Sequence, residues 1–332
     1  MKAIRDKILS VLLVLYLWGT ITSGIGYQLI SYALLRPFSR ARHARLLCWL
    51  QKHYLSQLVY CVERNHNLTI EWSGDEPPAN ESALVLPNHM THDWLPLYSM
   101  AYRQGTLGFV KTICKQAIAF VPSFGWTMWL GYWPFITRDW NKDQVYMRNF
   151  FKMMKEDDIP LCLWLFPEGT RITPSKKKLS QEHARLKGYP VFENVLLPRP
   201  KGLMLALQGL KDVTPYVYDV TLNYSGWGPA GPSITDILVG FDTEKKYALH
   251  VHVKRIPIEE VPDDEASLKQ WLLESFAAKD KLLEDFKSTG HFPGPIRQSK
   301  LEQAQFVFPF ALWSGMFVGA VAACATLYSS FC

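Results

Sequence analysis

The chain has 332 residues, and its 36 Lys and Arg against 30 Asp and Glu give a formal net charge of +6. This length suits one sizeable domain with additional segments. The basic excess is mild: it suits an anionic membrane face or phosphorylated substrates, and it excludes the strongly basic profile of a nucleic-acid-binding protein.

The first predicted element is an apolar run without charged residues over residues 8–35. About 20 apolar residues span a bilayer as a helix, so we expect a membrane anchor here. The competing interpretation is a signal peptide, but the run is too long and no clear cleavage site follows it. Arginines at 36, 40, 42 and 45 come next, so the positive-inside rule predicts that the chain from residue 36 onward lies in the cytosol.

Residues 40–64 alternate basic and apolar side chains at a spacing close to that of a helix. Two interpretations are open for this segment. The helix either packs against the domain that follows or lies in the membrane interface.

The central part of the chain, residues 65–300, alternates short apolar runs with amphipathic segments. This alternation predicts an α/β fold in which helices pack on a mostly buried central sheet. We expect strands at 68–72, 83–86, 107–110, 161–166, 213–222 and 249–254, and helices at 93–103, 142–155, 202–210 and 265–287. The polar, Lys-rich stretch 174–200 is expected to be a surface loop with one short helix near 180–187.

Residues 120–135 contain no charged residue and carry Trp126, Trp129 and Trp133. The segment is too short to span a bilayer. Because tryptophan favours the depth of the lipid headgroups, we predict a rim of the domain that dips into the membrane interface.

A second run without charge, residues 306–332, is long enough to insert into a membrane. The chain therefore divides into N-terminal transmembrane and interfacial helices at 1–64, a central domain at 65–300 and a C-terminal transmembrane segment at 301–332. The central domain is expected to be tethered to the bilayer at both ends.

Two polar segments follow predicted buried strands and carry residues suited to chemistry. His89 follows the first strand, and Asp93 lies four residues on, a spacing that puts both side chains on one helical face. A neutral imidazole can take a proton from a hydroxyl, and a carboxylate can fix its tautomer through the other ring nitrogen. We interpret His89 as a general base oriented by Asp93.

The second polar segment is Phe166-Pro167-Glu168-Gly169-Thr170-Arg171. Gly169 permits a backbone turn that is closed to residues with a Cβ atom. Arg171 can bind a phosphate through a fork of N–H donors. A base, its orienting acid and a phosphate-binding Arg are the groups needed to transfer an acyl group to a phosphorylated alcohol.

Residues 65–295 resemble the glycerophospholipid acyltransferase family, which includes the 1-acylglycerol-3-phosphate acyltransferases. The four blocks typical of that family occur in order, at residues 88–93, 135–138, 166–171 and 213–217. Segments 197–202 and 218–221 are similar to a branch that includes lysocardiolipin and lysophosphatidylinositol acyltransferases. One departure stands out: the family usually has four residues between the block-one His and Asp, whereas this chain has three.

The resemblance implies an acyl-CoA-dependent O-acyltransferase in the endoplasmic reticulum membrane, with lysophosphatidic acid as the first-choice acceptor. Lysophosphatidylinositol or lysocardiolipin is the alternative acceptor, and the shortened spacing leaves a non-catalytic lipid-binding membrane protein as an alternative of another class. The residues implied are His89 and Asp93 for catalysis, and Arg138, Glu168, Gly169, Thr170, Arg171 and Lys115 for substrate binding.

The expected partners are acyl-CoA as co-substrate, a lysophospholipid acceptor and the bilayer, with no cofactor and no nucleic acid. The cysteines at 48, 61, 114, 162, 324 and 332 show no metal-ligand spacing, so no metal site is expected. Two interpretations remain open for Lys176, Lys177 and Lys178. They either meet the phosphates of coenzyme A or form a solvated charge run.

Overall fold

A computed structural model describes residues 2–65, 67–91, 93–227, 231–233, 246–299, 301 and 304–331. Within these ranges the chain forms the expected α/β fold around a sheet of seven strands, in the order β3-β6-β2-β7-β8-β1-β9. The strands are β1 (Leu68–Gly74), β2 (Ala83–Pro87), β3 (Val110–Thr112), β6 (Cys162–Trp164), β7 (Tyr216–Ser225), β8 (Tyr247–Pro257) and β9 (Arg297–Ser299).

Four adjacent strands, β3, β6, β2 and β7, run parallel to one another. Every residue of β2 and β6 is buried, as is typical of parallel strands covered on both faces. Because parallel strands end at the same edge of the sheet, the segments after β2 and β6 meet there. This edge brings the two polar segments of the sequence together.

The predicted strand at 107–110 is misplaced, because the sheet begins only at Val110. Phe109 and Val110 both donate their backbone N–H to Thr106 O, at 2.9 Å each. These bonds turn the chain at residues 107–109, so the apolar residues there enter the core from a turn rather than from a strand.

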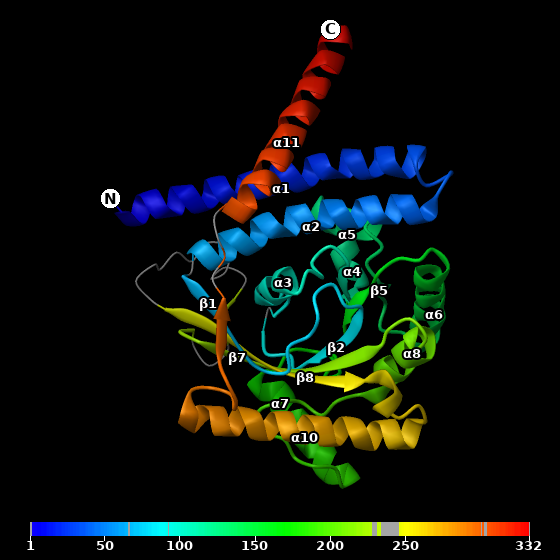
Figure 1. Cartoon of the computed structure of the whole chain (residues 1–332), viewed down its shortest axis with the longest axis vertical. Helices are drawn as coiled ribbons and strands as arrows, with labels where there is room; N and C mark the ends of the chain where they lie inside the picture. Colours follow the sequence, from blue (N-terminus) through cyan, green and yellow to red (C-terminus); the bar gives the residue numbers. More distant parts are fainter. Residues whose placement is uncertain are drawn as a thin grey trace.

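Helices cover both faces of the sheet (Figure 1). One face is covered by α2 (Arg40–Asn65) and α3 (Trp94–Arg103), which contribute Leu58 and Leu97 to one apolar cluster. The other is covered by α6 (Trp140–Glu156), α8 (Pro200–Leu210) and α10 (Glu265–Thr289), which supply Phe151, Leu203 and Phe276 to a second cluster. The position of α2 supports packing against the central domain, the first of the two interpretations of residues 40–64.

The helix in the Lys-rich stretch is longer than expected, because α7 spans Pro174–Lys187. Thr173 caps its start by accepting the backbone N–H of Lys176, and Pro174 occupies the first turn. Gly188 ends the helix with a positive φ of 66°. These start and stop signals lie within a stretch whose high charge suggested a loop.

The terminal apolar runs form α1 (Lys2–Leu34) and α11 (Ala304–Phe331). Both contain a stretch long and apolar enough to cross a membrane, at Val11–Leu34 and Ala304–Thr326, which is compatible with membrane association. Figure 1 shows α1 lying along α2, while α11 leaves the domain at a steep angle to both. The start of α11 is seated on α2 and α3, where Phe306 contacts the rings of Tyr60 and Tyr102.

The predicted membrane rim folds into α5 (Phe124–Leu130), which packs against α1. Trp126 and Trp129 of this helix are 50% and 64% exposed. A small two-stranded sheet of β4 (Cys114–Lys115) and β5 (Phe135–Ile136), together with α4 (Gln116–Ala119), flanks α5. Neither this second sheet nor β9 was predicted from the sequence.

Candidate active site

The imidazole of His89 and the carboxylate of Asp93 form a direct hydrogen bond of 2.7 Å between Nδ1 and Oδ2. Asp93 is 0% exposed, and an ionised carboxylate can only accept, so in a neutral imidazole this bond favours the tautomer with the hydrogen on Nδ1 and the lone pair on Nε2. His89 lies in the loop after β2, and Asp93 is the residue before α3. The pair therefore meets across a turn, and the helical face expected for it is not present. The shortened spacing still permits the contact.

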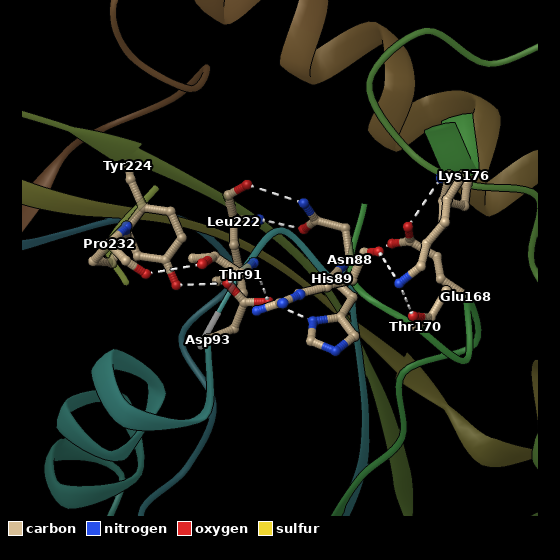
Figure 2. Close-up of polar contacts among 12 residues, drawn as sticks. Asn88, His89, Thr91, Asp93, Glu168, Thr170, Lys176, Leu222, Tyr224 and Pro232 are labelled. Carbon is tan, nitrogen blue, oxygen red and sulfur yellow. Dashed lines mark hydrogen bonds and ion pairs between the residues drawn. The ribbon is translucent and has the colours of Figure 1, made fainter. Parts of the chain in front are cut away.

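Asp93 has further partners that the sequence did not reveal (Figure 2). Tyr224 of β7 donates its hydroxyl to Asp93 Oδ1 at 2.8 Å. The backbone N–H of Thr91 lies 3.1 and 3.2 Å from the two carboxylate oxygens. Burial raises the pKa of Tyr224 well above its usual value, so the phenol stays protonated and remains a donor. A buried carboxylate with these donors is held in one orientation.

Asn88 fastens the same loop to the sheet. Its side chain donates to Leu222 O at 3.1 Å and accepts from Leu222 N at 2.7 Å. The amide thus makes the pair of bonds that a neighbouring strand would make, and extends the β2–β7 ladder past Pro87. The backbone that carries His89 is therefore part of the sheet edge.

The segment after β6 holds His89 from the opposite side. Glu168 is 2% exposed, and its Oε1 and Oε2 accept from the backbone N–H groups of His89 at 2.7 Å and Leu196 at 2.9 Å. The N–H of Ile172 donates to His89 O at 2.8 Å. Both backbone polar groups of His89 are thus bonded to the segment that contains Arg171.

Both hydrogen bonds of Glu168 hold backbone segments of the site, and the substrate-binding role that we predicted for it stays a prediction. Burial raises its pKa to about 8, against the lowering effect of the two N–H donors and of Lys279. Both of its oxygens are engaged with backbone groups inside the protein. This geometry assigns Glu168 to positioning the His89 loop.

Four cationic side chains gather beside this loop. Lys176, the first of them, donates to Thr170 Oγ1 at 2.6 Å and lies 3.4 Å from Arg171 O. Burial lowers the pKa of Lys176, and the positive charges of Arg171, Lys115 and Arg138 lower it further. Lys115, Arg138 and Arg171 were predicted from the sequence as substrate ligands. Each therefore lies close enough to Lys176 for its charge to act on the Lys176 amine.

A residue with a left-handed backbone conformation lies at or just before two of these cations, Arg138 and Arg171. Gly169 has a φ of 68°, the left-handed conformation expected for it, and Arg138 has a φ of 71° without being glycine. Asp143 holds the strained turn at Arg138. It accepts the N–H of Arg138 at 2.8 Å on one oxygen, and the N–H and hydroxyl of Thr137 at 2.8 and 2.9 Å on the other. Such strain persists where surrounding bonds enforce it, often at functional sites.

A buried cation supports the sheet beneath the site. Lys279 of α10 is 1% exposed, pairs with Asp219, and donates to Leu86 O at 3.0 Å and Val220 O at 2.6 Å. Burial lowers its pKa, which the charge of Asp219 opposes. The carbonyls of Leu86 in β2 and Val220 in the middle of β7 are thereby tied to α10.

The sequence carries two matches to known families over these same segments. An "Acyltransferase" profile matches residues 69–225, and an "Acyltransferase C-terminus" profile matches residues 241–315. The first covers the loops that hold His89, Asp93 and Glu168, and the strand β7 that carries Tyr224. The second covers α10 and its Lys279.

Individual proteins are similar over most of the chain. A probable 1-acyl-sn-glycerol-3-phosphate acyltransferase 5 of Arabidopsis thaliana is 32% identical over 85% of this chain and 74% of its own length. The 1-acyl-sn-glycerol-3-phosphate acyltransferase gamma of Homo sapiens is 36% identical over 80% of this chain and 70% of its own. The crystal structure of the 1-acyl-sn-glycerophosphate (LPA) acyltransferase PlsC from Thermotoga maritima aligns with 84% of this chain and 98% of that chain, at 19% identity and a TM-score of 0.42.

The similarity to these curated proteins extends well beyond the short motifs, since it takes in the sheet, the covering helices and both halves of the site. The chain belongs to the family of the 1-acyl-sn-glycerol-3-phosphate acyltransferases.

Proposed function

We propose that this protein transfers a fatty acyl group from acyl-CoA to the free hydroxyl of 1-acylglycerol-3-phosphate, giving phosphatidic acid. One observation carries the proposal: the backbone of His89 is bonded to Glu168 and Ile172, while its ring is bonded to Asp93. The base and the segment of Arg171 are therefore parts of one hydrogen-bonded unit. A single lysolipid can therefore contact both the base and the segment that carries Arg171.

The reaction needs no covalent enzyme intermediate. His89 Nε2 takes the proton of the acceptor hydroxyl, and that oxygen attacks the thioester carbonyl. Asp93 stabilises the imidazolium that forms, through the bond to Nδ1. The C–S bond then breaks, the ester is released, and the thiolate of coenzyme A receives the proton held by His89.

The charge of the site favours lysophosphatidic acid among the possible acceptors. Lys115, Arg138, Arg171 and Lys176 form a concentrated cationic group. A terminal phosphate monoester carries about −1.5 to −2 charges at pH 7 and offers three acceptor oxygens. Each phosphate diester of lysophosphatidylinositol or lysocardiolipin carries a single charge. The cationic group therefore attracts one such diester less strongly than it attracts a phosphate monoester. The names of the relatives agree with this choice.

We place the protein in the endoplasmic reticulum membrane with the active site on the cytosolic side, where acyl-CoA is available. The arginines after the first apolar run support this orientation. The exposed apolar side chains of α1 and α5 support contact with the bilayer on the side of the domain that carries α1.

A panel of lysolipids tests the function directly. The full-length protein in lipid nanodiscs is mixed with oleoyl-CoA and lysophosphatidic acid, lysophosphatidylinositol, lysocardiolipin or lysophosphatidylcholine. Product is measured by mass spectrometry, and coenzyme A release by a thiol reagent. We expect phosphatidic acid and free thiol in equal amounts, with the highest kcat/KM for lysophosphatidic acid.

Other outcomes of the panel separate the alternatives. A higher kcat/KM for lysophosphatidylinositol or lysocardiolipin would overturn the assignment of the acceptor and leave the type of reaction standing. Binding of lysolipids without any turnover would overturn the assignment of acyltransferase activity and favour a non-catalytic lipid-binding protein.

A further inference from the structure

A cavity of about 620 Å³ lies between α1, α4, α5 and the start of α6, apart from the catalytic residues. Its volume falls in the range of about 300–1,000 Å³ that is typical of small-molecule sites. Most of its wall is apolar and includes Ile25 and Leu29 of α1, Ala119 of α4 and Trp129 of α5. Polar side chains also line it, among them Gln116 and Lys142; the part lined by Thr137 and Asp143, whose side chains are hydrogen-bonded to each other, is called its polar end.

The polar end of this cavity adjoins the cationic group. Gln116 lines the cavity and follows Lys115 in the chain, and Thr137 lines it and precedes Arg138. Asp143 also lines the cavity, and it holds the backbone of Thr137 and Arg138. A ligand in the cavity would thus present its polar end next to two of the four cations.

Apolar contacts connect the cavity with the catalytic imidazole. The ring of His89 lies on that of Phe166, with 4.4 Å between the centroids. Phe166 packs against the apolar cluster to which Ala119 and Phe135 of the cavity wall also belong. Phe166, which the imidazole contacts, and two residues of the cavity wall therefore border the same apolar cluster.

We propose that this cavity holds the acyl chain that the acceptor lysolipid already carries, while the acceptor phosphate is bound by the cationic group. The assignment rests on the proposed function and adds a subsite to it. A lysolipid has only a glycerol unit between its phosphate and its chain, so a phosphate at Arg138 leaves the chain beside Thr137 and the cavity. In acyl-CoA a long pantetheine arm separates the phosphates from the acyl chain, which fits this short separation poorly.

The membrane side of the cavity gives the chain a route from the bilayer. Leu29 and Trp129 line the cavity and are 51% and 64% exposed. α1 and α5 pack against each other and carry these two side chains. A lysolipid can therefore slide its chain between the two helices without leaving the apolar phase.

Bulky substitutions at matched positions test the subsite. Ala119→Trp fills the cavity from α4, whereas Ala117→Trp adds the same ring to an exposed position of the same helix that does not line it. Leu29→Trp and its neighbour Ile30→Trp form a second pair on α1, where Ile30 is 55% exposed and outside the cavity wall. Each full-length variant is assayed in nanodiscs with oleoyl and hexanoyl lysophosphatidic acid, at a fixed concentration of oleoyl-CoA.

We expect both cavity variants to lower kcat/KM for the oleoyl acceptor by about tenfold, because several buried CH₂ groups lose their contacts. The hexanoyl acceptor should keep its kcat/KM within about twofold, and the two control variants should change neither value. A loss that is equal for both acceptors would overturn the proposal. In a second series the acceptor is oleoyl lysophosphatidic acid throughout, and oleoyl-CoA is compared with hexanoyl-CoA. A loss that depends on the chain length of the acyl-CoA would overturn the proposal, because the cavity would then hold the donor chain.

A binding measurement separates this proposal from the proposed function. Lysophosphatidic acid with a diazirine at the end of its chain is photolysed with the wild-type protein, and labelled peptides are identified by mass spectrometry. Labelling of peptides that contain Ala119 or Trp129, lost in Ala119→Trp and retained in Ala117→Trp, supports the subsite even if no acyl transfer is detected. Labelling elsewhere overturns the subsite, whether or not transfer occurs.

Discussion

The two halves of the active site are built in opposite ways. Asp93 and Glu168 are buried, and their oxygens accept hydrogen bonds from Tyr224 and from backbone N–H groups. Arg138 and Arg171 lie with exposed side chains on turns. Proton transfer needs heavy atoms within a few tenths of an ångström of one geometry, whereas a phosphate is attracted by any nearby group of cations. The buried half therefore sets the geometry, and the exposed half supplies charge.

This difference predicts how each half responds to substitution. A change in the buried half alters the alignment of the reacting atoms and should act on kcat. A change in the exposed half weakens attraction to the acceptor and should act mainly on KM. We expect the largest kinetic effect from replacing His89 and the smallest from replacing Lys176 in the cationic group.

Replacement of the base should have the largest effect. His89→Ala removes the group that takes the acceptor proton, and we expect kcat to fall by about 10³-fold. His183→Ala serves as the control, because His183 is exposed on α7 and should leave kcat unchanged. The rate of phosphatidic acid formation is measured with both substrates saturating. Near wild-type activity in His89→Ala would show that another group takes the proton.

Loss of a phosphate-binding charge should come next. Arg171→Ala removes a fork of donors, and a hydrogen bond to a charged group contributes about 1.5–3 kcal/mol. We expect KM for lysophosphatidic acid to rise by about 10- to 100-fold, with kcat within about threefold of wild type. The matched control is Arg185→Ala on the far end of α7, which should alter neither constant.

A contrary result at Arg171 would be informative. If Arg171→Ala lowered kcat and left KM unchanged, the guanidinium would act on the transition state rather than on the bound phosphate. The division between a geometric half and an electrostatic half would then be wrong at its most important residue.

The sequence predicted the residues of both halves but not the partners that hold them. Apolar runs and polar turns located β2 and β6 closely and β7 with a shift of three residues, and the family blocks gave His89, Asp93 and Arg171. Asn88–Leu222 and Tyr224–Asp93 join positions far apart in the chain, and they depend on the register that sets Pro87 opposite Val220. Because β2 is buried on both faces, its continuous apolar run lacks the alternation that would fix such a register.

Other misses have different causes. β7 was expected to end at residue 222, but it continues to Ser225 through polar residues and so brings Tyr224 to the site. Lys279 lies within the predicted helix 265–287, and only the packed sheet shows that its amine is buried. Local sequence preference describes only the neighbouring residues in the chain. Tertiary packing decides where a strand ends and whether a charged side chain is buried.

The bond from Tyr224 to Asp93 offers a finer test of the buried half. Tyr224→Phe removes one donor from a buried carboxylate and keeps the ring, at a cost of about 1–2 kcal/mol in transition-state alignment. We expect kcat to fall by about 5- to 30-fold with KM unchanged. Tyr216→Phe, on the same strand but beneath Arg255, is the control. An increase of KM alone would mean that the phenol contacts the acceptor.

The smallest effect should come from Lys176, the member of the Lys-rich run that belongs to the cationic group. Lys176 donates to Thr170 and belongs to the cationic group, whereas Lys178 of the same helix is exposed. We expect Lys176→Met to raise KM for lysophosphatidic acid by about two- to fivefold, because one of several charges near the phosphate is lost. Lys178→Met should change KM by less than about 1.5-fold.

Since added salt screens exposed charges, the difference between the two variants should shrink between 0.05 and about 0.5 M NaCl. Equal effects of the two substitutions, with the same dependence on salt, would mean that the run acts only through its total charge and that Lys176 has no specific place in the site.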